Sequence, residues 1–223
     1  MAPKTKKTAV VHRHLRHVPV SKRNPTGITP VSQHLRRISG STLAAKEIKE
    51  ITKQYKKKGL VYPTPNNLDC KDGNEYDDLI AIWVDYFNSK FITPPLAPLD
   101  PNIIKALIGS ESDFKKDPRN PKAIGIAQIT RPTLAALQDP NGEVKEFIFK
   151  DIRQKDLKEP EIAIPLSIRW LFRKGETAAS KLKRTPTIEE LILEYKGLLK
   201  SKSTFQKNAL EKFRNNYAKL TKK

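Results

Sequence analysis

Glu111 is the residue of this chain whose type and position most directly suggest acid–base chemistry. It lies at the end of a predicted helix that begins at Asp100 and Pro101, a typical N-cap followed by a typical first helical residue. The apolar residues on one face of this helix are Ile104, Leu107 and Ile108. Glu111 continues that face at the same spacing, so its carboxylate should be paired with a cation or protonated. A carboxyl group that holds its proton near neutral pH can act as a general acid.

Two short motifs accompany this carboxylate. The first is Glu-Ser-x-Phe at residues 111–114, and the second is Gly-Ile-Ala-Gln-Ile at residues 125–129. In type, order and spacing they resemble the lytic transglycosylase and goose-type lysozyme-like superfamily, over roughly residues 99–220. Catalytic domains of that family continue with a helix that ends in Tyr-Asn-x-Gly. Here Tyr195 matches, Lys196 replaces the Asn, and Gly197 comes one position early.

The resemblance implies a lysozyme-like helical fold and cleavage of the glycan strands of peptidoglycan, with no metal and no cofactor. It implies that Glu111 is the catalytic residue. It further implies a group of substrate-binding residues: Ser112, Gly125, Gln128 and Tyr195.

The residues alone leave other interpretations open. Glu111 is also compatible with a surface carboxylate that pairs with Lys115 or Lys116. Gln128 is also compatible with a polar position in the first turn of the next helix. Gly125 most simply supplies a backbone turn. Tyr195 lies on an apolar stripe, where a ring can be buried while its hydroxyl reaches a cleft.

Glycoside hydrolysis generally requires two carboxylates that flank the bond. Asp113 should point away from the face of Glu111, and Asp117 is better explained as a turn former paired with Lys116 or Arg119. The sequence therefore favours the single-carboxylate scheme of the lytic transglycosylases, which ends in a 1,6-anhydro ring. A hydrolytic muramidase on the same fold is the alternative.

The segments that must position these residues have sequence patterns that predict helices. Helices are predicted near residues 43–58, with Ser41 or Thr42 as the cap, and near 75–91, 100–111, 132–137, 161–173, 188–199 and 204–220; one more is expected within 141–158. No convincing strand is found, so the predicted fold class is all-α. We expect a basic arm over residues 1–40, a helical segment over 41–95 that packs on the core, and the catalytic domain over 96–223.

The charge of the chain is concentrated at its ends. The formal net charge is +19, and residues 1–40 contain nine Lys or Arg and neither Asp nor Glu. These residues also lack aromatic side chains, so we expect them to be disordered or extended in isolation. The pattern V-x-x-H-L-R occurs at residues 11–16 and again at 31–36. The arm is therefore interpreted as a docking segment, and chance similarity of the two short patterns is the alternative.

Other features of the sequence narrow the classes of protein to which the chain could belong. Neither a phosphate-binding glycine-rich loop, a Cys-x-x-Cys pair nor a Gly-x-Ser-x-Gly motif is present. Cys70 is the single cysteine and is interpreted as a structural or incidental thiol. His12, His14 and His17 lie in a cationic arm that disfavours a metal site. No apolar run reaches the length of a transmembrane helix.

The location and partners follow from the expected substrate. We expect synthesis in the cytoplasm without a signal peptide and action in the periplasm or cell wall after non-classical delivery by a phage, an injection apparatus or a secretion apparatus. Peptidoglycan is the expected partner, with a particle component or an immunity protein as further candidates. A nucleic-acid-binding or structural particle protein is the rival class, but the basic ends contain few aromatic side chains for base stacking.

Overall fold

The computed structural model describes residues 42–90, 98–118, 120–144 and 146–222, together with four short strands between residues 9 and 36. The chain divides into two compact units, Met1–Ser41 and Thr42–Lys223. The described part contains no helix that is both long and apolar enough to cross a membrane.

The described segments of the first unit are four short strands, and the expectation of a basic docking arm over residues 1–40 stays a prediction. β1 (Ala9–Val11) pairs antiparallel with β4 (His34–Arg36), and β2 (His14–His17) pairs antiparallel with β3 (Ile28–Val31). The register places Val11 opposite His34 and His14 opposite Val31. The Val of each V-x-x-H-L-R pattern is thus paired with the His of the other pattern. The β-branched residues of these segments favour this extended backbone.

The second unit is mainly helical, as predicted. Its described helices are α1 (Ala45–Gln54), α2 (Asp77–Ser89), α3 (Pro101–Ser112), α4 (Arg131–Gln138), α5 (Pro160–Leu182), α6 (Ile188–Tyr195) and α7 (Ser203–Thr221). The predicted caps of two helices are confirmed: the side chain of Asp100 accepts a hydrogen bond from Asn102 N, and that of Thr187 accepts one from Glu190 N.

Three predictions about secondary structure are wrong. Thr42 does not cap α1, because Thr42–Ala44 forms strand β5 and Ala44 occupies the cap position. The helix expected within residues 141–158 is replaced by strand β8 (Ile148–Lys150) and the 3-10 helix η1 (Gln154–Lys158). The exclusion of strands also fails, since β5 pairs in parallel with β8, and β6 (Ala123–Ile124) pairs with β7 (Ile129–Thr130). Each of these strands has only two or three residues, too few for a recognisable alternation.

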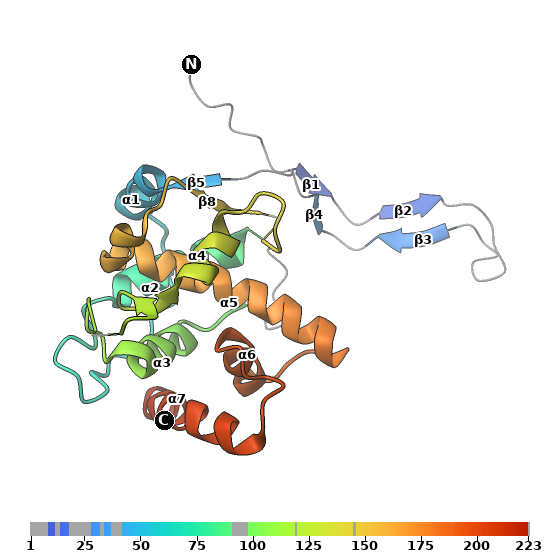
Figure 1. Ribbon diagram of the computed structural model, residues 1–223. Helices are drawn as coiled ribbons and strands as arrows, with labels where there is room; N and C mark the ends of the chain where they lie inside the picture. The colour runs from blue at the N-terminus through green and yellow to red at the C-terminus, as the bar shows by residue number, and fades with distance from the viewer. Residues whose placement is uncertain are drawn as a thin grey trace. The chain divides into compact units, whose positions relative to one another are not determined.

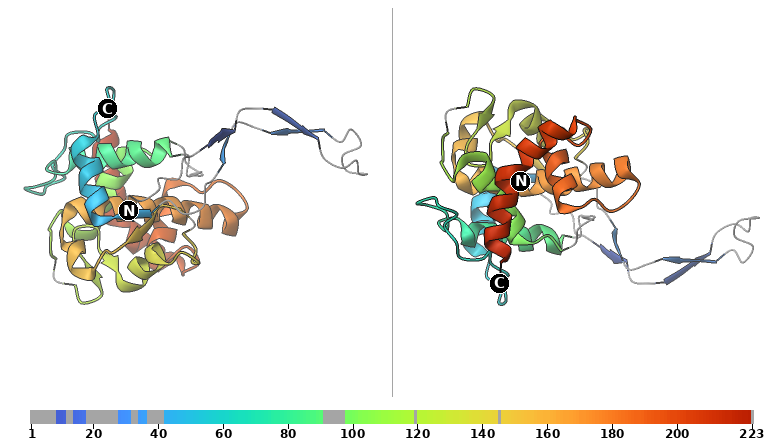
Figure 2. Two further views of the ribbon diagram at one scale, coloured as in Figure 1. Left: turned by 90° about the horizontal axis from the view of Figure 1, so that it is seen from above. Right: turned by 90° about the horizontal axis from the view of Figure 1, so that it is seen from below.

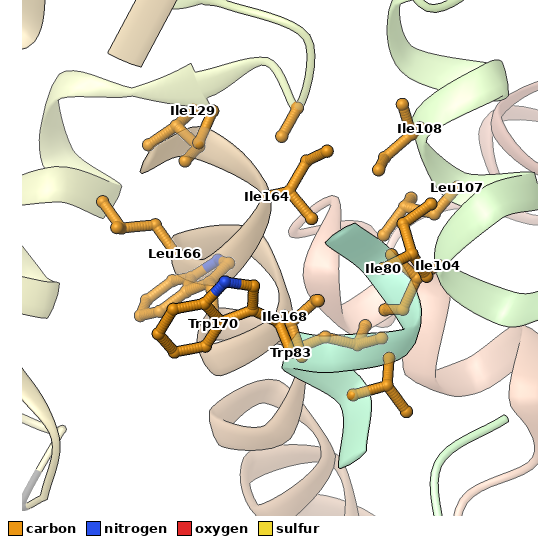
Figure 3. Packing of buried hydrophobic residues seen from close by; sticks show 14 of the residues in the cluster. Ile80, Trp83, Ile104, Leu107, Ile108, Ile129, Ile164, Leu166, Ile168 and Trp170 are labelled. Atoms are coloured by element: carbon orange, nitrogen blue, oxygen red, sulfur yellow. The ribbon is translucent and has the colours of Figure 1, made fainter. Parts of the chain in front are cut away.

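Helix α5 runs through the middle of the helical unit and packs against α1, α2, α4 and α6 (Figure 1). Helix α7 lies along α3 (Figure 2). In Figure 3 the labelled side chains of α3 point toward those of α2 and α5. Every residue of α3 from Ile103 to Gly109 is buried, so the packing encloses the helix up to the turn that precedes Glu111 and thereby fixes the direction in which the Glu111 side chain leaves the helix.

Lys105 is a buried cation within the otherwise apolar face of α3. Its side chain is 0% exposed, and its ammonium donates hydrogen bonds to Thr64 O (3.0 Å), Asn74 Oδ1 (2.6 Å) and Asp77 Oδ2 (2.8 Å). Burial lowers the pKa of Lys105 and raises that of Asp77, and the contact between the two groups opposes both shifts. All three ammonium hydrogens are satisfied, so Lys105 ties the connector before α2 to α3.

Candidate functional site

A cavity of about 290 Å³ brings together residues from separate segments of the helical unit. Its lining comes from the end of α3, the segment around β6 and β7, the start of α4, the middle of α5 and the end of α6. The lining residues are Glu111, Asn120, Lys122, Ala123, Gln128, Ile129, Thr130, Thr133, Trp170, Tyr195 and Lys196. Three of the predicted site residues, Glu111, Gln128 and Tyr195, therefore lie around one space. A larger cavity of about 660 Å³, between α2 and the start of α5, contains none of the predicted site residues.

Glu111 is paired with a cation that its helix periodicity does not reveal. The Lys196 ammonium contacts Glu111 Oε1, and the two side chains are 16% and 18% exposed, respectively. The expected partner Lys116 instead contacts Glu75 Oε1 at 3.2 Å. The carboxylate thus lies at the wall of the cavity rather than on the open helix surface. In the sequence, Lys196 was notable only because it follows Tyr195 where the Tyr-Asn-x-Gly motif has Asn.

The turn between β6 and β7 depends on Gly125. Its φ is +72°, a value that glycine adopts without strain, and an added Cβ would lie 1.9 Å from Leu157 O. The chain can therefore pass this close to η1 only with glycine at this position. Gly125 is not among the cavity-lining residues, so its contribution is to the backbone path.

Gln128 closes this turn with φ of +48°, outside the helical conformation considered for it. Its backbone N–H and its side-chain Nε2 both donate to Gly125 O, at 3.1 and 2.9 Å. Asn120 Nδ2 donates to Gln128 Oε1 at 2.7 Å. These bonds orient the amide and, among the described residues, leave its second N–H available as a donor. Asn120 has no sequence signal that would have identified it.

Tyr195 connects α6 to the same turn. Its hydroxyl donates to Ala127 O at 3.4 Å, and its ring packs against the hydrophobic core. Burial, with a smaller contribution from nearby Glu111, raises the pKa of the Tyr195 hydroxyl. The hydroxyl therefore remains a hydrogen-bond donor over the physiological range. Tyr195 thus both packs against the hydrophobic core and lines the cavity.

Ser112 is buried, and its hydroxyl donates to Ile108 O of its own helix at 3.3 Å. It is not among the residues that line the cavity, and its binding role stays a prediction.

The other acids near Glu111 face elsewhere. Asp113 contacts Lys212 Nζ at 2.7 Å, and Asp117 contacts Lys158 Nζ at 2.8 Å rather than the predicted Lys116 or Arg119. Arg119 lies outside the described residues. Among the described residues that line the cavity, Glu111 is the only acid.

Neither the single thiol nor a metal cluster adds chemistry to this region. Cys70 is half-buried beside Leu68 O and Asp113, and burial raises the pKa of its thiol, which disfavours the reactive thiolate. Within the described residues, no group of three His, Cys, Asp or Glu side chains could hold a metal ion. His12 and the side chains of His14 and His17 lie outside the part of the chain that the structure describes.

Comparison with protein families, with curated proteins and with solved structures finds no match to this chain. Its function is therefore inferred from the residues and geometry of the cavity.

Proposed function

We propose that this chain is a lytic transglycosylase that cleaves the β-1,4 bond between N-acetylmuramic acid and N-acetylglucosamine in peptidoglycan. The observation that carries the proposal is the placement of Glu111, Gln128 and Tyr195 around one cavity. These three residues come from three segments that are distant in sequence, and each belongs to one of the three motifs described above. A cleft with one acid and converging hydrogen-bond donors suits a glycan substrate.

In the proposed reaction, Glu111 first donates its proton to the glycosidic oxygen. The C1–O bond of the muramic acid breaks, and the departing N-acetylglucosamine keeps that proton as its 4-hydroxyl. The carbonyl oxygen of the substrate's own N-acetyl group bonds to C1 and stabilises the positive charge. The Glu111 carboxylate then takes the proton of the muramic acid C6 hydroxyl, O6 bonds to C1, and the N-acetyl oxygen leaves. The product carries a 1,6-anhydro ring, and Glu111 regains its proton.

The charge of the cavity lining supports this one-carboxylate scheme. The described lining contains no second acid that could act as a nucleophile or activate a water molecule. The oriented amide of Gln128 and the protonated hydroxyl of Tyr195 are neutral groups. Their proposed role is to hold the sugar and the loop around it rather than to transfer protons.

The first test is the variant Glu111→Gln, which keeps the shape of the side chain but removes its transferable proton. We expect clearing of purified peptidoglycan to slow by about 10²–10⁴-fold, the usual contribution of general acid–base catalysis. Glu211→Gln, on the exposed surface of α7, is the matched control and should clear at the wild-type rate. Wild-type clearing by Glu111→Gln would contradict the proposed role of Glu111.

The second test identifies the chemistry. Mass spectrometry of the released muropeptides should show anhydro-muramic ends, lighter by one water molecule than reducing ends. Reducing ends alone would assign the chain as a hydrolytic muramidase. The absence of any product would favour a structural or nucleic-acid-binding role.

A further inference from the structure

The cavity around Glu111 contains more positive than negative side chains. Its lining includes one acid, Glu111, and two lysines, Lys122 and Lys196. Lys122 is exposed, and no described residue forms an ion pair with it. Lys196 has Glu111 as its carboxylate partner. A ligand that carries one carboxylate would balance the charge of this lining.

The contact between Lys196 and Glu111 bears directly on the proposed reaction. Lys196 contacts Oε1 of Glu111, both residues line the cavity, and both side chains are more than four-fifths buried. While this contact persists, that oxygen is engaged with an ammonium group and is not free to approach a glycosidic oxygen. Glu111 can therefore act through Oε1 only after Lys196 has moved to another partner.

Lys196 is well placed to make that exchange. It is the C-cap residue of α6, where a positive charge is favourable, and its flexible four-carbon side chain can swing without moving the helix. A mostly buried ammonium that leaves one carboxylate needs another, because an unpaired buried charge is strongly unfavourable. A neutral sugar offers no such partner.

We propose that Lys196, assisted by Lys122, binds a carboxylate carried by the lactyl group of the muramic acid residue, and that this binding releases Glu111 for catalysis. This inference rests on the function proposed above. Peptidoglycan presents this carboxylate where the stem peptide has been removed; where the stem peptide remains, the lactyl carbonyl is an uncharged amide. Binding of this carboxylate moves Lys196 away from Glu111, and the freed Glu111 takes up from solvent the proton that it donates in the proposed reaction. Lys196 is thus a specificity-determining residue.

The test compares three glycan substrates with the full chain. The first is glycan strands whose stem peptides have been removed by an amidase, which leaves free lactyl carboxylates. The second is the same strands with those carboxylates converted to methylamides, and the third is strands that keep their stem peptides. The kcat/KM of cleavage should be at least about tenfold higher for the free carboxylate than for the methylamide, the usual effect of a hydrogen bond to a charged group. The third substrate, whose lactyl carbonyl is likewise an amide, should be cleaved more slowly than the first.

The variant Lys196→Met removes the charge and keeps much of the length. We expect it to cleave the carboxylate and methylamide strands at similar rates, because Glu111 is then free with either substrate. Lys200→Met, an exposed lysine just beyond α6, is the matched control and should keep the wild-type preference. A merely structural role of Lys196 would lower both rates and leave their ratio unchanged.

Two results would overturn the inference while leaving the proposed function intact: equal cleavage of the carboxylate and methylamide strands by the wild type, or an unchanged preference in Lys196→Met. If no substrate is cleaved, the proposed function fails, and binding then tests Lys196 separately. The Kd of uncleaved strands, measured by calorimetry, should still favour the carboxylate form for the wild type and not for Lys196→Met. Equal Kd values of the wild type for the carboxylate and methylamide strands would overturn the inference in that case also.

Discussion

The ion pair between Lys105 and Asp77 should be one of the most sensitive points in the helical unit, because it holds the connector before α2 against α3. The change Lys105→Met fills the same space but removes all three hydrogen bonds of the buried ammonium. Breaking a buried ion pair by removing one partner costs about 3–5 kcal/mol. The Asp77 side chain is still 16% exposed, so partial hydration places the expected loss near the lower end, about 3 kcal/mol.

Urea unfolding followed by circular dichroism measures this loss, and the melting temperature should fall by about 6–12 °C for a unit of this size. The double variant Lys105→Met, Asp77→Asn removes the charge that the single variant leaves unpaired. It should therefore be more stable than Lys105→Met alone. A double variant as unstable as the single one would contradict the assignment of the loss to an unpaired carboxylate.

The loss should also depend on pH. Burial already raises the pKa of Asp77 above its ordinary 3.8, and Lys105 opposes that rise. Without Lys105 the folded-state pKa rises further, so the folded state of the variant is penalised wherever Asp77 is ionised. This penalty is complete above the folded-state pKa and disappears as the pH falls below about 3.8. The stability difference between wild type and variant should shrink on acidification, and a difference that is constant from pH 3 to pH 8 would refute the reasoning.

Two further predictions concern the turn at the cavity and the division of the chain. Gly125→Ala should destabilise the helical unit by more than Gly197→Ala. Both positions have positive φ, which costs a non-glycine residue about 1–2 kcal/mol. Only at Gly125 does the added Cβ also meet a backbone oxygen. Equal losses of unfolding free energy in the two variants, measured by urea unfolding, would show that the close approach to Leu157 O adds no further cost. A chain that begins at Thr42, the first residue of the second unit, should cleave soluble glycan fragments at the wild-type rate. Loss of that cleavage would show that the basic first unit takes part in catalysis.

Much of the helical framework was predictable because its signals are local. The Asp100 cap, the Pro101 start and the apolar spacing that ends at Glu111 all lie within one helix, α3. The Thr187 cap of α6 is likewise encoded within a single turn. The short strands were missed because pairs such as β5 and β8 are stabilised by a distant partner, and the three residues of β8 carry too little pattern to distinguish strand from helix.

The candidate site likewise combines features that local sequence signals predict with contacts between distant parts of the chain. The sequence by itself determined that a carboxylate ends the buried face of α3 and that a glycine turn precedes Gln128. Only the tertiary structure decided that Lys196, 85 positions along the chain, is the partner of Glu111, and that Tyr195 reaches Ala127 across 68 positions. Helix periodicity and caps depend on neighbours within one or two turns. The contact between Lys196 and Glu111 depends on how α6 packs on α5 and α7 while α3 packs on α2 and α7, and no local pattern in the sequence encodes that placement.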